Sequence, residues 1–160
     1  NNAKSHAVIV GAGPMGRTVA KTLLVRGRSV CLVDLNPVNL QPFKQSGVPT
    51  VQGNGADYEI LQRAGIGRAQ LVFVTAPNDA VSLEIVKSAR ALNPTVAIAA
   101  RTRFGVNVAP LERAGAQLVL CEEETIAADM VVLLERHFAA QAAAEAAKNV
   151  DATAPQVSHA

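Results

Sequence analysis

The stretch that decides the fold is Gly11-Ala-Gly13-Pro-Met-Gly16, which follows the apolar run Ala7–Val10 without a gap. The spacing GxGxxG between a strand and a helix builds a loop that binds pyrophosphate. Gly11 allows a tight turn, Gly13 lets the backbone approach the phosphates, and Gly16 lets the helix pack closely on the strand. Free N–H groups at the helix start then face the phosphates. The first helical turn, which supplies these groups except at the proline, comprises Pro14, Met15, Gly16 and Arg17.

An acidic residue follows the loop at the distance that such a site requires. Asp34 ends the apolar run Val30–Asp34 and comes 18 residues after Gly16, the last glycine of the loop. A carboxylate there accepts hydrogen bonds from the ribose hydroxyls of an adenosine and repels a 2′-phosphate. Neither Leu35 nor Asn36 supplies a cation that offsets this repulsion. The sequence therefore predicts an adenine nucleotide site that prefers NAD or simple adenosine phosphates to NADP.

Short apolar runs bounded by turn residues predict six strands. They are Ala7–Val10, Val30–Asp34, Thr50–Gln52, Leu71–Thr75, Val96–Ala100 and Leu118–Cys121. Helical segments alternate with these runs, and the alternation predicts right-handed crossovers and a parallel sheet. We therefore expect an α/β fold of the Rossmann type, a single domain with a doubly wound sheet in the order 3-2-1-4-5-6. Its ligand crevice lies between the first and fourth strands.

Capping residues indicate where the intervening helices begin and end. The expected N-caps are Asn36, Asp57 and Asn78, and the expected stops are Gly65 and Asn93-Pro94.

A last helix begins near Glu123 and carries one apolar stripe, formed by Ile126, Met130, Leu133, Leu134 and His137. Val131 and Val132 lie off this stripe and indicate a second buried face, as expected of a homodimer. Beyond Ala139 the stripe is lost. We therefore predict a nucleotide-binding domain over residues 1–138 and, over residues 139–160, an Ala-rich helical extension that ends in a disordered tail.

The loop after the third strand is expected beside an adenine ring. Asn54 offers its amide to a base edge, and Gly55 and Ala56 leave room for a flat ring. The alternative for this loop is a tight turn that leads into the cap at Asp57.

Two more segments are expected at the same edge of the sheet. Thr75, Ala76 and Asn78 follow the fourth strand and face the glycine loop, with Asn78 either a ligand contact or only the helix cap. Arg101 ends the fifth strand, where its guanidinium either neutralises phosphate or pairs with Asp79 or Glu122.

Composition narrows the class of protein. The net charge of +2 is small and the aromatic content is 3%, which argues against a nucleic-acid partner. Cys31 and Cys121 each lie in an apolar run, so we expect two buried thiols and no disulfide. No apolar stretch is long enough to cross a bilayer, and no signal peptide opens the chain, so the sequence predicts a soluble protein. The histidines are dispersed and no nucleophile lies beside a base, so we expect no enzyme.

The sequence resembles the nucleotide-binding domain of the regulator of potassium conductance (RCK) family, found on Trk and Ktr uptake systems, potassium channels and Kef-type potassium/proton antiporters. The stretches that carry the resemblance are VIVGAGPMGRTVAKTLLVRG, VCLVDLNP, VQGNGADYEILQRAGI, LVFVTAPNDAVSLEIVKSARALNP, AIAARTR and LERAGAQLVLCEEETIAADM. They cover about Ala7 to His137.

The resemblance implies a cytoplasmic domain at the inner face of the membrane. It implies a homodimer that binds NAD(H), ATP, ADP or AMP and gates a potassium transporter or antiporter. The residues it places at the nucleotide are Gly11, Gly13, Gly16, Asp34, Asn54, Thr75, Asn78 and Arg101. Many relatives have Arg where this chain has Pro14 and Asp where it has Asn54; the latter is typical of the Kef-like branch. Because Pro14 supplies no cation near the phosphates, the sequence favours AMP or a dinucleotide over a triphosphate.

We therefore expect a nucleotide-sensing regulatory domain of a potassium transport system, closest to the cytosolic domain of a Kef-type antiporter. The alternatives are the cofactor domain of an NAD-dependent oxidoreductase and a scaffold with an empty crevice.

Overall fold

A computed structural model describes residues 6–152 of the chain. Its strands are β1 (His6–Val10), β2 (Ser29–Asp34), β3 (Thr50–Gln52), β4 (Leu71–Val74), β5 (Ala97–Thr102) and β6 (Leu118–Cys121). Its α-helices are α1 (Pro14–Val25), α2 (Pro37–Gln45), α3 (Tyr58–Arg63), α4 (Asp79–Leu92), α5 (Val108–Ala114) and α6 (Glu122–Ala152). Two short 3₁₀ helices, η1 (Ile66–Arg68) and η2 (Gly105–Asn107), complete the elements.

Within these residues the strands form one all-parallel sheet in the order β3-β2-β1-β4-β5-β6, which confirms the predicted order. β1 is central: Val8 pairs with Cys31 of β2 on one side and with Val72 of β4 on the other. The connections leave β1 in opposite directions, so the crevice at the carboxyl ends of β1 and β4 is where a ligand of this fold binds.

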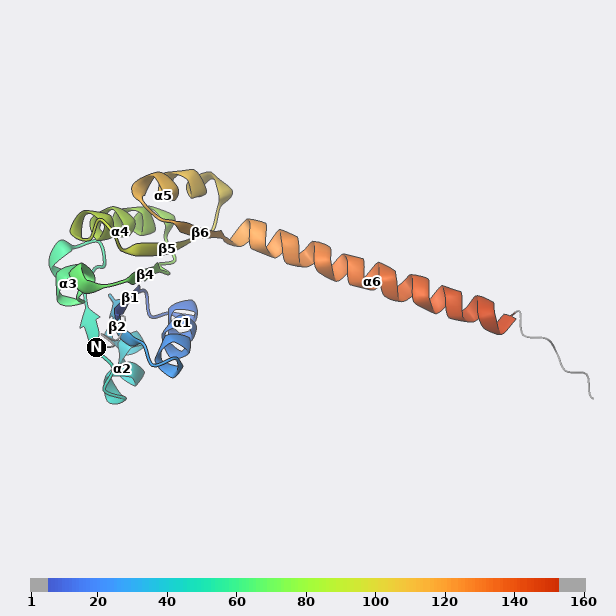
Figure 1. The fold of residues 1–160 in the computed structure, drawn as a ribbon, viewed down its shortest axis with the longest axis horizontal. Helices are drawn as coiled ribbons and strands as arrows, with labels where there is room; N and C mark the ends of the chain where they lie inside the picture. Colours follow the sequence, from blue (N-terminus) through green and yellow to red (C-terminus); the bar gives the residue numbers. More distant parts are fainter. Residues whose placement is uncertain (1–5, 153–160) are drawn as a thin grey trace, which may run out of the picture. The chain divides into compact units, whose positions relative to one another are not determined.

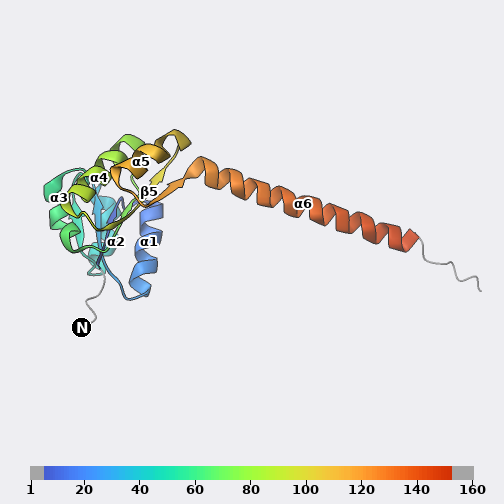
Figure 2. The same ribbon diagram turned by 45° about the horizontal axis from the view of Figure 1, so that its top comes forward.

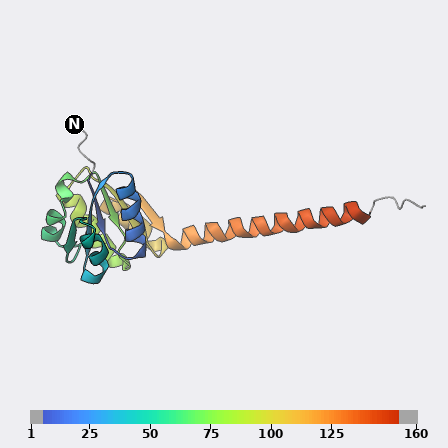
Figure 3. The same ribbon diagram turned by 90° about the horizontal axis from the view of Figure 1, so that it is seen from below.

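The two faces of the sheet carry different helices. α1 and α2 lie on one face, and α3, α4 and α5 lie on the other (Figures 1 and 2). Figure 3, seen from below, shows α1 in blue lying against the strands. Alternate residues of β1 serve the two cores, because successive strand side chains point to opposite faces. Ile9 packs in one buried cluster with Leu40 of α2, and Val8 packs in the other with Ile85 of α4.

The bounds of β5 differ from the expected Val96–Ala100, since the strand runs from Ala97 to Thr102. Arg101 and Thr102 belong to the strand because they pair with β6. The backbone of Arg101 is therefore fixed inside the sheet. The helix α5, which crosses from β5 to β6, was not among those delimited from the sequence.

Two of the three predicted helix caps form their hydrogen bonds. The Asn36 side chain accepts a bond from the Val38 N–H (3.0 Å), and the Asn78 side chain accepts one from the Val81 N–H (3.1 Å). Asp57 does precede α3, but its side chain makes no capping bond. The predicted position of this cap is confirmed, and the Asp57 side chain is exposed.

Both cysteines are buried and unbridged, as predicted from their apolar surroundings. Burial raises the pKa of the Cys31 thiol to about 11, despite the nearby Arg68 that acts to lower it. This thiol is therefore protonated at neutral pH.

The last helix starts at Glu122 and continues to Ala152, and the sequence between them contains no glycine or proline that would break it. The contacts between residues group the chain into two compact units, and the boundary between the units follows Glu123. The expected boundary at residue 138 therefore lies inside a continuous helix. The division into residues 1–138 and 139–160 stays a prediction, and residues 153–160 lie outside the described part. No helix within residues 6–152 is long and apolar enough to span a bilayer.

The apolar stripe of α6 is exposed. None of the residues of α6 is buried, and Ile126, Met130 and Leu133 are 58%, 59% and 62% exposed. Val131 and Val132, off the stripe, are exposed as well.

Candidate functional site

A cavity of about 470 Å³ lies at the carboxyl ends of β1, β2 and β4, where the sequence predicts the crevice. Thirteen of the fifteen predicted site residues line it. They are Gly11, Gly13, Pro14, Met15, Gly16, Asp34, Leu35, Asn54, Gly55, Thr75, Ala76, Asn78 and Arg101. The two that do not line it are Arg17 and Ala56.

Two glycines of the loop have the tight geometry that their spacing predicts, and the third borders open space. Gly11 has φ +107°, in the region that favours glycine, and a β-carbon there would lie 2.6 Å from the Thr75 hydroxyl. A β-carbon at Gly16 would lie 1.8 Å from the Gly11 carbonyl oxygen, so the helix packs against the loop only because Gly16 has none. At Gly13 a β-carbon would meet no protein atom within 4 Å, because this glycine faces open space.

The N-terminus of α1 borders the cavity, and no side chain of the described residues caps its first N–H groups. Gly13 is the N-cap residue, no side chain caps the helix, and Pro14 occupies its first turn. Met15 and Gly16, which carry N–H groups of that turn, both line the cavity. Uncapped N–H groups at a helix N-terminus are a site for an anion.

Asp34 holds the glycine loop in place. Its Oδ2 accepts hydrogen bonds from the Ala12 N–H (2.7 Å) and the Asn39 amide (3.3 Å). Its Oδ1 accepts one from the Asn36 N–H (2.7 Å). An ionised carboxylate has about four acceptor positions, so one remains for a ligand hydroxyl. The sequence predicted the ligand contact but not this second task.

Arg17 stands behind the loop, outside the cavity. Its Nε donates to the Ala12 carbonyl (2.8 Å) and its Nη2 donates to Asn39 Oδ1 (3.1 Å). The guanidinium is therefore used to brace the loop that Asp34 also holds. The sequence predicted Arg17 among the site residues, but Arg17 is not one of the residues that line the cavity.

The loop after β3 forms the tight turn that was the alternative, while Asn54 and Gly55 also line the cavity. The Asn54 side chain accepts a bond from the Ala56 N–H (3.0 Å), which makes this turn. A β-carbon at Gly55 would lie 2.2 Å from Val10 Cγ1, so Val10 fills the room expected for a ring. Ala56 packs against the core and its carbonyl accepts a bond from Ser88 (2.8 Å), which turns it away from the cavity.

The segment after β4 closes the other wall. The Thr75 hydroxyl donates to the Gly11 carbonyl (2.9 Å), which ties β4 to the glycine loop across the crevice. Asn78 both caps α4 and lines the cavity, so the two expectations for it are compatible.

Arg101 is the one cationic side chain among the described residues that line this cavity, and Asp34 is the one carboxylate. Arg101 Nη1 forms an ion pair with Glu122 Oε1 at 2.7 Å, and its Nε donates to the Ala76 carbonyl at 3.3 Å. Of the two ion-pair partners considered from the sequence, Glu122 is the one found.

The sequence analysis missed several lining residues. They are Val10, Val33, Asn36, Asn39, Gly53, Pro77, Val81 and Ile85. Val81 and Ile85 belong to one face of α4, and their four-residue spacing is also that of an ordinary core stripe, so the pattern alone does not distinguish a cavity wall. Asn39 carries a findable signal, because its position one turn after the Asn36 cap directs it back toward Asp34.

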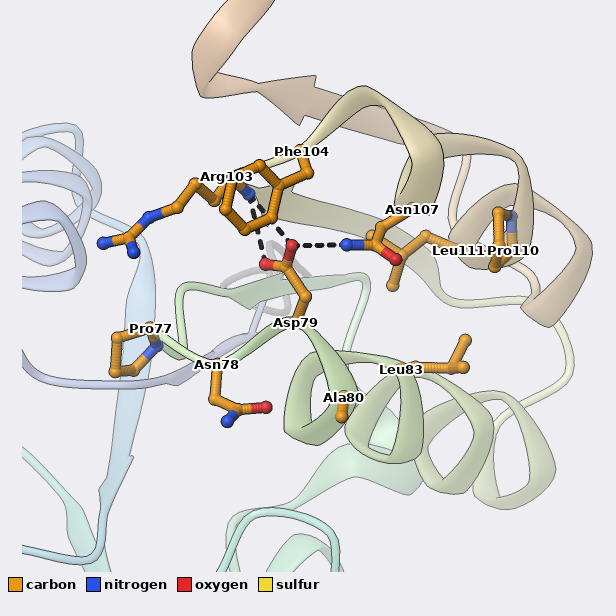
Figure 4. A pocket seen from close by; sticks show the side chains of 10 residues that line it. All are labelled: Pro77, Asn78, Asp79, Ala80, Leu83, Arg103, Phe104, Asn107, Pro110 and Leu111. Atoms are coloured by element: carbon orange, nitrogen blue, oxygen red, sulfur yellow. Dashed lines mark hydrogen bonds between the residues drawn. The ribbon is translucent and has the colours of Figure 1, made fainter.

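A second cavity, of about 520 Å³, lies between the start of α4 and the segment from β5 to α5. Figure 4 shows the Asp79 carboxylate at its floor, with Arg103 and Phe104 above it and Asn107 beside it. Asp79 accepts bonds from the Thr102 hydroxyl (2.7 Å), the Arg103 N–H (3.1 Å) and the Asn107 amide (2.6 Å). Asp79 therefore joins α4 to the segment that follows β5.

Desolvation of the Asp79 carboxyl acts to raise its pKa, but the hydrogen bonds from Thr102, Arg103 and Asn107 outweigh it, and the pKa is lowered from 3.8. The ionised form is therefore the one that holds these elements together.

No group of three His, Cys, Asp or Glu side chains in residues 6–152 is arranged to hold a metal ion.

The TrkA-N domain model matches residues 7–122, which is most of the chain. The chain belongs to the TrkA-N domain family. This confirms the resemblance to nucleotide-binding domains of the RCK type that the sequence motifs indicated.

The TrkA-N domain of the Escherichia coli inner membrane protein YbaL is similar in both sequence and structure. Its crystal structure has a TM-score of 0.78 and 34% identity, covering 84% of this chain and 99% of that one. The full YbaL, described as a putative cation/proton antiporter, is 35% identical over 131 residues. The putative K(+) efflux antiporter KefB of Alkalimonas amylolytica is 30% identical over 129 residues, 81% of this chain. The chain spans 24% of the length of YbaL and 19% of that of KefB.

A structure of the Shewanella denitrificans Kef C-terminal domain in an AMP-bound form has the same fold. Its TM-score is 0.70 at 23% identity, with 93% of this chain and 94% of that chain covered.

We predict that Gly16→Ala lowers the free energy of unfolding by about 1–3 kcal/mol, because a β-carbon there overlaps the Gly11 carbonyl. Gly13→Ala is the matched control and changes stability by less than about 0.5 kcal/mol, since its β-carbon meets nothing. Urea unfolding of the two variants measures the difference. Equal stabilities would contradict the close packing of α1 on the loop.

We predict that Asp79→Ala destabilises the domain by about 1–3 kcal/mol at pH 7. The folded pKa of Asp79 lies below 3.8, so its contribution is present above that pH and is lost as the pH falls through the folded value. The gap between variant and wild type should therefore shrink below about pH 4. Urea unfolding from pH 7 to pH 3 measures it, with Asp57→Ala, whose side chain makes no capping bond, as control. A gap that does not change with pH would contradict this role.

Proposed function

We propose that this TrkA-N domain binds an adenine nucleotide in the cavity at β1 and β4 and is the nucleotide-sensing regulatory domain of a potassium transport system. One observation carries the proposal: the uncapped N-terminus of α1 faces a cavity that also contains the Asp34 carboxylate and the Arg101 guanidinium. Backbone N–H groups, a carboxylate and a guanidinium match the phosphate and the ribose of a nucleotide.

The ligand we propose is AMP or NAD(H). Its phosphate lies at Gly13, Met15 and Gly16, and its ribose hydroxyls donate to the acceptor position that Asp34 keeps. Among the described lining residues Arg101 is the one cation, which favours one or two phosphates over three, so ATP binds less well. NADP is disfavoured because Asp34 repels a 2′-phosphate. The AMP-bound Kef structure, which shares the fold, supports AMP.

Apolar side chains supply a surface for the base. Val33 and Leu35 come from the end of β2, and Val81 and Ile85 come from the face of α4 that lines the cavity. Leu35 is 67% exposed and Val81 is 40% exposed, so both have apolar surface for a planar ring to cover.

We propose a regulator and not an enzyme. YbaL and KefB are named as putative antiporters, and neither name indicates an oxidoreductase, which was the alternative. The sequence relatives extend well beyond the part that matches this chain, so the membrane partner we propose is a transporter of the Kef type. The domain then works at the cytoplasmic face of the membrane. Coupling is a difference in nucleotide affinity between two states of the transporter.

We also propose that the domain is a homodimer formed through α6. The helix presents Ile126, Met130, Leu133, Leu134 and Phe138 at three- and four-residue spacings, and each is more than half exposed. A continuous apolar stripe of this kind is typical of a protein–protein contact. A second copy carries the same stripe and provides a matching surface.

We expect Gly13→Ala to bind AMP at least about tenfold more weakly than wild type, a loss of about 1.4 kcal/mol, because the new methyl group occupies the space of the phosphate. The fold stays intact, since Gly13 has φ −69°, which alanine adopts readily. Isothermal titration calorimetry measures the affinity, and Gly67→Ala, also in open space but away from the cavity, is the control. Wild-type protein that binds neither AMP nor NADH, or unchanged binding by Gly13→Ala, would refute the proposal.

For the dimer, we expect wild type to sediment as a dimer and Met130→Glu/Leu134→Glu to sediment as a monomer at the same concentration. Two carboxylates on the stripe oppose burial of its apolar surface. Ala139→Glu adds a charge to the face of α6 opposite the stripe and should leave the dimer intact. A monomeric wild type would contradict the dimer and leave the nucleotide proposal standing.

A further inference from the structure

The cation that lines the nucleotide cavity is already paired. Arg101 and Glu122 form their 2.7 Å ion pair where both side chains are largely shielded, with 17% and 30% of their surfaces exposed. The Ala76 carbonyl accepts from Arg101 Nε and fixes the direction of the guanidinium. No hydrogen bond of Arg101 Nη2 is present among the described residues, so the group retains donors beyond those used for Glu122.

The two partners of this pair belong to different functional parts of the domain. Arg101 lies on β5 and lines the cavity, whereas Glu122 does not line it and is the first residue of α6. β6 pairs with β5, so Thr102 is opposite Cys121 and Glu122 follows directly. A side chain of the nucleotide site thus contacts the first turn of the helix that carries the exposed apolar stripe.

The charges near the cavity leave Arg101 as the one cation available both to Glu122 and to a ligand among the described residues. Among the described lining residues, Arg101 is the one cation, and Asp34 already contributes a negative charge. A phosphate that enters such a site gains little from a guanidinium that a carboxylate at 2.7 Å has neutralised.

We propose that Glu122 and the phosphate of the bound nucleotide compete for Arg101. In the empty site Arg101 forms its ion pair with Glu122. When a nucleotide with a phosphate binds, the guanidinium donates its hydrogen bonds to the phosphate instead, and the ion pair with Glu122 breaks. The pair therefore sets the affinity for the phosphate and reports occupancy to the first turn of α6. This inference rests on the proposed nucleotide site and adds the residue that opposes binding there.

The test measures the affinity of the full chain for AMP and for adenosine, which lacks the phosphate. Glu122→Gln should bind AMP about two- to fivefold more tightly than wild type, the range expected for loss of a partly exposed ion pair. Its affinity for adenosine should be unchanged. In an Arg101→Gln background, Glu122→Gln should no longer alter AMP affinity, because the guanidinium for which Glu122 and the phosphate compete has been removed.

Glu124→Gln is the matched control, because it removes the same charge from the same turn at an exposed position. It should bind AMP as wild type does. A gain for Glu122→Gln that is absent, equal to that of Glu124→Gln, or equally large for adenosine would overturn the competition. Weaker AMP binding by Glu122→Gln would also overturn it, since Glu122 would then orient Arg101 for the ligand.

Hydrogen exchange of the segment 122–130 tests the second half of the inference. AMP should speed exchange in this segment relative to adenosine in wild type, and this difference should disappear in Glu122→Gln. Equal exchange with AMP and adenosine would overturn the link to α6. If wild type binds neither AMP nor NADH, the proposed function fails; if it binds AMP while Glu122→Gln behaves as wild type, only this inference fails.

Discussion

The structure depends on one close approach, between the start of α1 and the turn that follows β1. A β-carbon at Gly16 has no room beside the Gly11 carbonyl, so the backbone of the helix touches the backbone of the turn. This contact aims the N-terminus of α1 across the carboxyl end of β1. The anion site is therefore made by backbone geometry, and the side chains around it have the task of keeping that geometry fixed.

Three side chains hold the turn from separate elements. Asp34 bonds it from β2, Thr75 bonds it from the end of β4, and Arg17 bonds it from α1 itself. Because these bonds converge on Gly11 and Ala12, the N–H groups that we propose for phosphate are held in place by the protein itself. A preorganised site loses less conformational freedom on binding, which is consistent with the task of a sensor.

The order of the strands and the glycine site could be predicted because both depend on local patterns: apolar runs, turn residues and the spacing of three glycines. What could not be predicted depends on contacts between distant residues. Gly55 has the composition of a ligand loop, yet Val10 of β1 occupies its space. Arg17 is a cation one turn after the phosphate loop, yet its guanidinium points back to Ala12. In each case the residue type indicated the site and a tertiary contact set its actual role.

The described lining of the cavity carries little net charge, whereas a site that binds nucleotides tightly would be strongly positive. Among the described lining residues Arg101 is the one cation and Asp34 is the one carboxylate, and a second carboxylate, Glu122, forms an ion pair with Arg101. The first turn of α1 begins with Pro14 and offers no cation to the cavity, so for the phosphate that we propose there the attraction comes mostly from the helix dipole and the backbone N–H groups. Modest attraction permits release, and a domain that reports changes in nucleotide concentration needs a ligand that leaves as well as one that binds.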